Sequence, residues 1–177
     1  MLKLAAALEL ANRAIGKAMA WLCLAMVVVT CIVVVERYWF SSGSIRLQES
    51  ITLMHAMVFM LAAAYTLAAG GHVRVDVFYG AMSARRRALV DLLGCLLLLF
   101  PFCAFLLWAS WDFVAVSWQI RESSSEAGGL PYPFMPLMKS CIPVAAVMLF
   151  TQGIAMSLTS ISSLRDHPRA SDSGAEG

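Results

Sequence analysis

Three ionisable side chains at alternate positions are the most chemically specific feature of this sequence. His72, Arg74 and Asp76 alternate with valines within the stretch from Gly70 to Arg87. In an extended backbone successive side chains point to opposite faces, so the three ionisable groups would share one face. An acid/base pair of His72 and Asp76 would have no accompanying nucleophile or metal ligands, so the sequence does not indicate an enzyme. A solvated turn with a local ion pair is an equally good interpretation.

A second candidate for chemistry is His55, which stands inside an otherwise apolar run. An ionisable residue within a membrane span is a functional candidate, and a packing role with a hydrogen bond to a neighbour explains it equally well. A bis-histidine haem site is disfavoured because His72 and His167 lie outside the apolar runs. Four of the five cysteines stand in such runs, so we expect no disulfide framework, metal site or cofactor.

The composition is that of a membrane protein. Hydrophobic residues make up 60% and charged residues 14% of the 177 positions, against about 45–50% and roughly 25% in soluble domains. The net charge of +2 is too small to indicate a nucleic-acid partner and suggests nothing beyond lipid headgroups. We therefore expect an all-α integral membrane protein.

Four apolar runs have about the length of membrane-spanning helices. At about 1.5 Å per helical residue even the shortest nearly crosses a bilayer core of roughly 30 Å. The predicted spans of this membrane domain, residues 18–161, are about 18–35, 51–69, 88–111 and 141–161. Pro101 should kink the third span, because proline removes a backbone hydrogen bond. One face of the second span carries small or hydroxyl residues, which allow membrane helices to approach each other closely. Its members are His55, Ala62, Thr66 and Ala69.

Polar segments flank the membrane domain at both ends. Residues 1–17 carry a polar stripe at helical spacing opposite a face of alanine, leucine and isoleucine, which predicts an amphipathic helix in the headgroup plane. The stripe consists of Glu9, Asn12, Arg13, Gly16 and Lys17. A soluble or frayed N-terminus is the alternative, and Glu9 interrupts the apolar run that a cleaved signal peptide would need. Residues 162–177 are rich in Ser, Asp and Gly, and we expect a disordered cytoplasmic tail.

The positions of lysine and arginine predict the orientation in the membrane. Arg85, Arg86 and Arg87 stand directly before the third apolar run, and basic residues in short loops hold a loop on the cytoplasmic side. Asp91 follows Arg87 by four residues, a spacing that allows the two to pair on a helix. With the N-terminus inside, nine of the thirteen basic residues fall in inner segments. Both termini are therefore expected in the cytoplasm.

The predicted spans hold few groups that could carry a polar solute. A protein that transports an ion or anion alone needs polar groups or broken helices near the bilayer midplane. The sequence therefore favours an accessory membrane subunit that serves a larger partner. The alternative is a self-sufficient small homo-oligomeric transporter or channel. A small drug exporter would need a carboxylate in its first span, and residues 18–35 contain none.

Several short motifs agree in order and spacing with one family. They are Glu49, Ala62-Ala-Ala-Tyr-Thr66, Gly71-His-Val-Arg-Val-Asp-Val-Phe-Tyr79, Ser83-Ala-Arg85, Val90-Asp-Leu-Leu-Gly94, Gly128-Gly-Leu-Pro131, Lys139, Ile142-Pro-Val144 and Gln152-Gly153. The match in order and spacing extends over nearly all of residues 18–161. The sequence thus strongly resembles the small permease subunit (DctQ-type) of tripartite ATP-independent periplasmic (TRAP) transporters.

The resemblance implies a four-helix subunit of the bacterial inner membrane that binds a large multi-spanning permease subunit. It further implies a separate periplasmic solute-binding protein, uptake driven by a sodium or proton gradient, and organic acids as solutes. With His55 added, the candidate structural or partner-contacting residues are Arg37, Glu49, His55, His72, Arg74 and Asp76. None of them is implied to bind substrate. The sequence departs from the family pattern at residues 123–125 and 132–136, so the solute subgroup does not follow from the resemblance.

Overall fold

The computed structural model describes residues 2–69 and 82–166, and all secondary structure in these two ranges is helical. The helices are α1 (Leu2–Trp39), α2 (Ile45–Ala68), α4 (Ala84–Gly94), the π-helical turn η1 (Cys95–Leu99), α5 (Phe100–Gln119) and α6 (Phe134–Asp166). Because α4, η1 and α5 follow one another without a break, the described residues form four helices long and apolar enough to cross a membrane. The predicted all-α class, with four helices able to span a membrane, is thereby confirmed, whereas the span boundaries and the orientation stay predictions.

Each helix extends beyond the apolar run that predicted it. The second span was predicted from residue 51, whereas α2 begins at Ile45, directly after Ser44. The Ser44 hydroxyl accepts a hydrogen bond from the backbone N–H of Leu47, which satisfies one donor of the first helical turn. Apolar composition marks only the part of a helix suited to lipid, while capping determines where the helix begins.

The N-terminal segment differs from the prediction of a separate helix at residues 1–17. The structure has no break after Lys17, and α1 continues to Trp39. Asn12, from the predicted polar stripe, is only 3% exposed and lies inside the helix assembly. At Asn12 the stripe therefore faces the interior of the helix layer, where the side-chain amide of Gln152 on α6 is its partner. A position of residues 1–17 in the headgroup plane stays a prediction.

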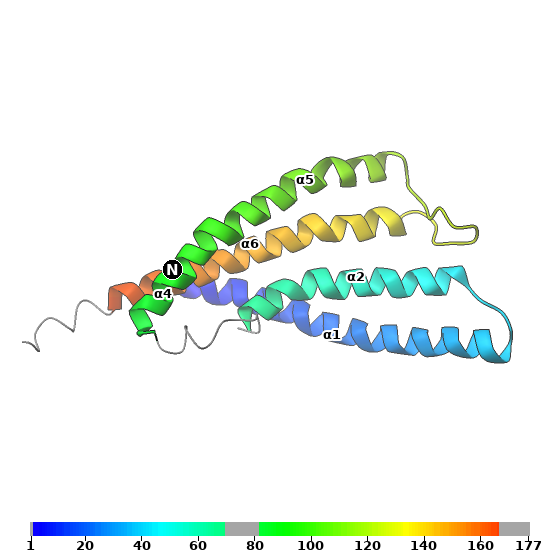
Figure 1. Cartoon of the computed structure of the whole chain (residues 1–177), viewed down its shortest axis with the longest axis horizontal. Helices are drawn as coiled ribbons and strands as arrows, with labels where there is room; N and C mark the ends of the chain where they lie inside the picture. Colours follow the sequence, from blue (N-terminus) through cyan, green and yellow to red (C-terminus); the bar gives the residue numbers. More distant parts are fainter. Residues whose placement is uncertain (1, 70–81, 167–177) are drawn as a thin grey trace, which may run out of the picture.

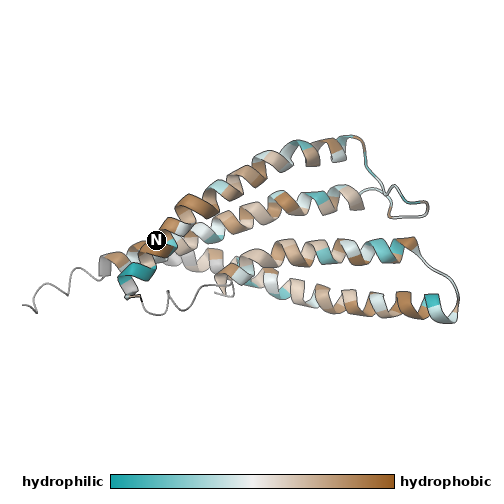
Figure 2. Cartoon of the chain, in the orientation of Figure 1, coloured by the Kyte–Doolittle hydropathy of each residue, from teal (hydrophilic) through white to brown (hydrophobic). Residues whose placement is uncertain are grey.

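The four long helices lie side by side as a layer in which α6 occupies an inner place. Figure 1 shows the order α5, α6, α2 and α1 across the layer. The helix α6 packs against α1, α2, α4, η1 and α5. The beginning of α1 and the end of α6 lie at one end of the molecule, and the two connections 40–44 and 120–133 lie at the other, which we call the loop end. Hydrophobic residues cover the long middle of each helix (Figure 2).

Small residues allow the helices to approach closely. A β-carbon added at Gly16 of α1 would overlap the Tyr65 ring of α2. One added at Gly153 of α6 would come within 2.7 Å of Leu99 and 2.8 Å of Phe100. The buried residues of α6 are also mostly small, which is typical of contacts between membrane helices. They include Cys141, Ala145, Ala146, Ala155 and Ser157.

A π-helical turn precedes Pro101. At the end of η1 the backbone N–H of Phe100 donates to the carbonyl of Cys95, five residues earlier. Proline has no N–H and its ring crowds the preceding turn, and a wider turn is one way for a helix to accommodate it. The path of the chain curves between α4 and α5 (Figure 1), in agreement with the bend predicted at Pro101.

The α2 face that was predicted to meet a neighbouring helix is exposed at both of its ends. His55 and Ala69 are exposed, whereas the buried residues of α2 are Leu53 and Ala64 on the opposite side. The prediction rested on residue size and polarity. Ala64, which is as small as the half-buried Ala62, is the fully buried one.

Candidate functional site

The structure separates the residues that the sequence singled out. Arg37 lies in the last turn of α1 and Glu49 near the start of α2, so both are at the loop end. His55 lies on the same helix as Glu49, six residues further from the loop end, or about 9 Å along the axis. His72, Arg74 and Asp76 lie outside the described residues, and their predicted roles stay predictions.

Glu49 joins α2 to the connection 120–133. One carboxylate oxygen accepts a hydrogen bond from the backbone N–H of Leu130 at 2.6 Å, and the other accepts one from the Ser124 hydroxyl. Ser124 in turn receives the N–H of Glu126, and its own N–H donates to the Leu130 carbonyl. Hydrogen bonds to an ionised acceptor are stronger than neutral ones, so the carboxylate fixes this connection against α2.

Two glycines make this close approach possible. Gly128 has a φ of 83°, a conformation that residues with a β-carbon rarely adopt. A β-carbon at Gly129 would meet the Ser124 side chain and, at 2.7 Å, the Glu49 carboxylate. The Gly128-Gly129 pair therefore serves a geometric purpose in the loop. We call Glu49, Ser124, Gly129 and Leu130 the Glu49 clamp.

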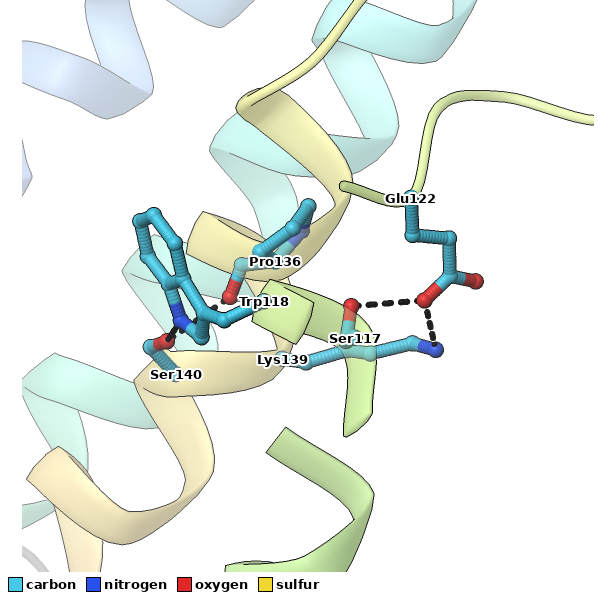
Figure 3. A network of polar contacts seen from close by, with 6 residues as sticks. All are labelled: Ser117, Trp118, Glu122, Pro136, Lys139 and Ser140. Atoms are coloured by element: carbon cyan, nitrogen blue, oxygen red, sulfur yellow. Dashed lines mark hydrogen bonds and ion pairs between the residues drawn. The ribbon is translucent and has the colours of Figure 1, made fainter. Parts of the chain in front are cut away.

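A second polar network joins the end of α5 to the first turns of α6, and Figure 3 shows it from close by. One oxygen of Glu122 accepts hydrogen bonds from the Ser117 hydroxyl at 2.6 Å and from Lys139 Nζ at 2.5 Å. Lys139 Nζ also lies 4.1 Å from the centre of the Phe113 ring, a cation–π distance. We call Ser117, Glu122 and Lys139 the Glu122 network.

Trp118 makes a further contact between α5 and α6. Trp118 Nε1 donates to the Ser140 hydroxyl at 3.0 Å, and that hydroxyl donates to the Pro136 carbonyl at 2.7 Å (Figure 3). The Trp118 ring meets Tyr132 edge-on, with ring centroids 6.0 Å apart. Both ends of the connection 120–133 are thus attached to the helices.

The electrostatics of Glu122 favour its ionised form. The hydrogen bonds from Lys139 and Ser117, with the positive charge of Lys139 added, hold the pKa of Glu122 below its ordinary value of 4.5, although desolvation opposes this. The carboxylate is therefore charged at neutral pH and keeps both donors in place. Glu122 and Lys139 lie 17 residues apart, so no short-range spacing in the sequence marks them as partners.

Another polar pair that sequence reasoning missed lies inside the helix layer. Asn12 Nδ2 donates to Gln152 Oε1 at 2.9 Å, which joins α1 to α6 across 140 residues of sequence. Gln152 is 1% exposed, and its Nε2 has no hydrogen-bond partner among the described residues. Away from water, two amides gain from pairing with each other, so this pair stabilises the α1–α6 contact.

The arginines predicted to set the orientation begin α4. Arg85 and Arg86 are exposed, and Arg87 Nε donates to the carbonyl of Met82 at 3.0 Å. Arg87 and Asp91 both line a cleft between α4 and α6 together with Ser160. Positive charge at a helix N-terminus opposes the helix dipole, so helix stability does not explain these residues.

A comparison with known protein families identifies the family of this chain. The model of the family described as "Tripartite ATP-independent periplasmic transporters, DctQ component" matches residues 26–162, well over half of the chain. The chain belongs to this family. The resemblance found in the motifs is thereby confirmed. No curated protein matches the chain significantly.

Most of the polar contacts described above lie within the part of this DctQ component that the family model matches. Residues 26–162 include the Glu49 clamp, the Glu122 network and Gln152, whereas Asn12 precedes the matched region. The DctQ family is a family of transporter components and not of enzymes, and the alternative of a self-sufficient transporter is not favoured. The described residues contain no group of three or more His, Cys, Asp or Glu placed to hold a metal ion. The site thus consists of contacts that fix an extramembrane loop to membrane helices.

Proposed function

We propose that this DctQ component is the small membrane subunit of a TRAP-type secondary transporter. It supports a large multi-spanning permease subunit in the uptake of an organic acid-like solute, which a periplasmic binding protein delivers. An ion gradient drives the uptake. The observation that carries this proposal is the family match over residues 26–162.

The interior of the described helices supports a role without a solute path of its own. The buried polar side chains among the described residues are all uncharged amides or hydroxyls. They are Asn12, Ser110, Ser117, Gln152, Ser157 and Ser160. A site for an anionic solute or its coupling ion would need charged groups or exposed backbone ends at the midplane. We therefore assign solute binding to the partner subunits.

In this proposal the loop end faces the periplasm and both ends of the chain face the cytoplasm of a bacterial inner membrane. The arginines at the start of α4, at the opposite end of the molecule from the loops, support this orientation. The Glu49 clamp and the Glu122 network then lie on the side where the binding protein arrives. Their role is to present the connection 120–133 in one fixed conformation.

Transport assays with and without this chain test the proposal. In cells that express the large permease subunit and the binding protein, deleting this chain should abolish solute uptake, and restoring it should restore uptake. In detergent the chain should co-purify with the large subunit. Purified chain alone, reconstituted in liposomes, should leave the solute outside. Uptake by these liposomes would overturn the assignment, as would unimpaired uptake in the deletion strain.

A further inference from the structure

The outward face of α2 carries polar side chains within the membrane span. Gln48, Thr52, His55 and Phe59 are all exposed and follow one another at spacings of four, three and four residues. These spacings put them on one side of the helix. The same side continues through Ala62 and Thr66, which are half-buried. We call Gln48, Thr52, His55 and Phe59 the α2 stripe.

The other exposed helix faces differ in character from the α2 stripe. Along α1 the large exposed hydrophobic residues include Trp21, Leu24, Val27, Val28 and Ile32. Along α4, η1 and α5 they are leucines, valines and aromatic residues, among them Leu97 at 69% and Trp108 at 78% exposure. Such faces are suited to lipid chains, which accept no hydrogen bonds. Thr30 on α1 is also exposed, but its hydroxyl donates to the Met26 carbonyl of its own helix. The α2 stripe differs from these faces in carrying an imidazole, His55, within the predicted span 51–69.

An imidazole that faces lipid within a span is energetically unfavourable. Ionisable residues in membrane helices almost always face a protein interior or a water-filled cavity. No hydrogen bond joins the His55 ring to another described residue, so this chain supplies no such surroundings in the described ranges. The Thr52 hydroxyl, by contrast, donates to the Gln48 carbonyl of its own helix. Burial of His55 against another protein would remove the cost.

An apolar cleft adjoins the α2 stripe. It has a volume of about 260 Å³ and lies where residues of α2, α5 and α6 meet. Phe59, which belongs to the stripe, lines it together with Ala63, Phe102, Leu106, Ala145 and Leu149. The stripe and the cleft are thus continuous at Phe59. A helix lying along the stripe could place an apolar side chain in this cleft, in the manner of helix-in-groove recognition.

We propose that the α2 stripe and this cleft form the docking site for a transmembrane helix of the large permease subunit. The inference rests on the proposed function and adds to it the contacting surface. The partner helix places apolar side chains against Phe59 and the cleft. At the depth of His55 it presents a hydrogen-bonding side chain, because only such a group satisfies an imidazole inside the bilayer. Lipid then covers the outer faces of α1 and α5.

Photo-crosslinking in the assembled complex tests the location. A photo-crosslinking residue is introduced as Phe59→p-benzoylphenylalanine and, as a control on a lipid-type face, as Val28→p-benzoylphenylalanine. Both positions are exposed within a membrane helix. Position 59 should crosslink to the large subunit and position 28 should not. If the complex co-purifies but crosslinks form only from position 28, the docking site is wrong while the proposed function stands.

A matched pair of threonines and a histidine series test the polar contact. Thr30 on α1 and Thr52 on α2 are both exposed, and both hydroxyls donate to a carbonyl four residues earlier. Thr52→Val should weaken co-purification with the large subunit more than Thr30→Val does. His55→Leu should weaken it about three- to tenfold, the size of one hydrogen bond between membrane helices, and His55→Gln should retain part of it.

The outcomes distinguish the two levels of the proposal. Failure of the unmodified chain to co-purify with the large subunit would refute the proposed function, and the docking site with it. Normal co-purification of Thr52→Val and His55→Leu, with a loss for Thr30→Val, would refute the docking site alone. Thermal unfolding of each purified variant identifies any loss that comes from the fold, because a folded variant keeps the midpoint of the unmodified chain.

Discussion

Glu49 shows what a single residue does at the loop end. Its carboxylate receives hydrogen bonds from Ser124 and Leu130, which follow it by 75 and 81 residues. The sequence motifs indicated Glu49 as a structural or partner-contacting residue, and the structure gives it contacts within the chain. A periodic sequence pattern cannot identify these partners, because a contact between a helix and a distant loop produces no regular spacing in the sequence.

The first prediction concerns the Glu49 clamp. Glu49→Ala removes the acceptor for the Leu130 N–H, so exchange of that amide with solvent should accelerate about tenfold. Hydrogen exchange followed at Leu130 is the measurement. Glu126→Ala is the control, because Glu126 is exposed in the same loop and takes part through its backbone alone. Its N–H donates to the Ser124 hydroxyl and its carbonyl accepts from the Gly129 N–H. Equal exchange rates in the two variants would contradict the clamp.

The second prediction concerns the acid response of Glu122. Its pKa is lowered in the folded protein by the hydrogen bonds from Lys139 and Ser117 and by the charge of Lys139. A lowered pKa means that the contribution of Glu122 to stability is fully present above its unfolded value and is lost as pH falls through the folded value. The carboxyl group, followed by carbon NMR, should therefore titrate with a midpoint below 4.5.

Substitution of its partner tests the cause of that shift. Lys139→Met removes the largest contribution to the lowered pKa, so the Glu122 midpoint should rise toward its ordinary value. Arg121→Met serves as the control, since Arg121 is the exposed neighbour of Glu122 in sequence. Among the described residues its side chain makes no hydrogen bond or ion pair with the Glu122 carboxylate. A rise of equal size in both variants would show that general positive charge, and not the Lys139 contact, lowers the pKa.

At the scale of whole elements, the apolar runs predicted four helices because each run has about the length that a membrane-spanning helix needs. They could not show how far a helix continues beyond the lipid, so α2 begins at Ile45 and not at residue 51. They also could not show which face meets which neighbour. Asn12 suggested a headgroup-facing stripe, but its amide partner Gln152 lies 140 residues away on α6. His55 suggested an internal contact, and α2 turns it outward.

A prediction at this scale concerns the contact of α1 with α2. Gly16→Ala places a β-carbon on the Tyr65 ring close to its backbone, where the side chain cannot move aside. The two helices must separate, and we expect a loss of about 1–3 kcal/mol in the free energy of unfolding. Denaturant unfolding in detergent micelles measures it.

Gly94→Ala is the matched control for the glycine at the helix contact. Gly94 ends α4, has helical backbone angles, and has nothing within 4 Å of an added β-carbon. Alanine there should leave stability unchanged or raise it by up to about 1 kcal/mol, because alanine has the higher helix propensity. A loss of the same size in both variants would show that the tight contact with Tyr65 has no special cost.

At the scale of the whole molecule, an even number of spans places the two ends of the chain on one side of the membrane. The described residues form an even number of such helices, four that are long and apolar enough to span. The charges predict which side that is. Arg85, Arg86 and Arg87 begin α4 at the end opposite the loops, and a positive triplet at a helix N-terminus has no benefit for the helix itself. We therefore predict that these arginines hold their end of the molecule in the cytoplasm.

Cysteine labelling in intact cells tests that orientation. Ser83→Cys reports on the start of α4 and Ser42→Cys on the loop end, and both serines are exposed. A membrane-impermeant maleimide added outside should label position 42 and not position 83. When Arg85, Arg86 and Arg87 are all replaced by glutamine, part of the population should invert, so position 83 becomes labelled and position 42 partly protected. Arg37→Gln is the control, because Arg37 lies at the loop end, where removing a positive charge should strengthen the original orientation. Unchanged labelling in the triple variant would show that the remaining basic residues set the orientation without the triplet.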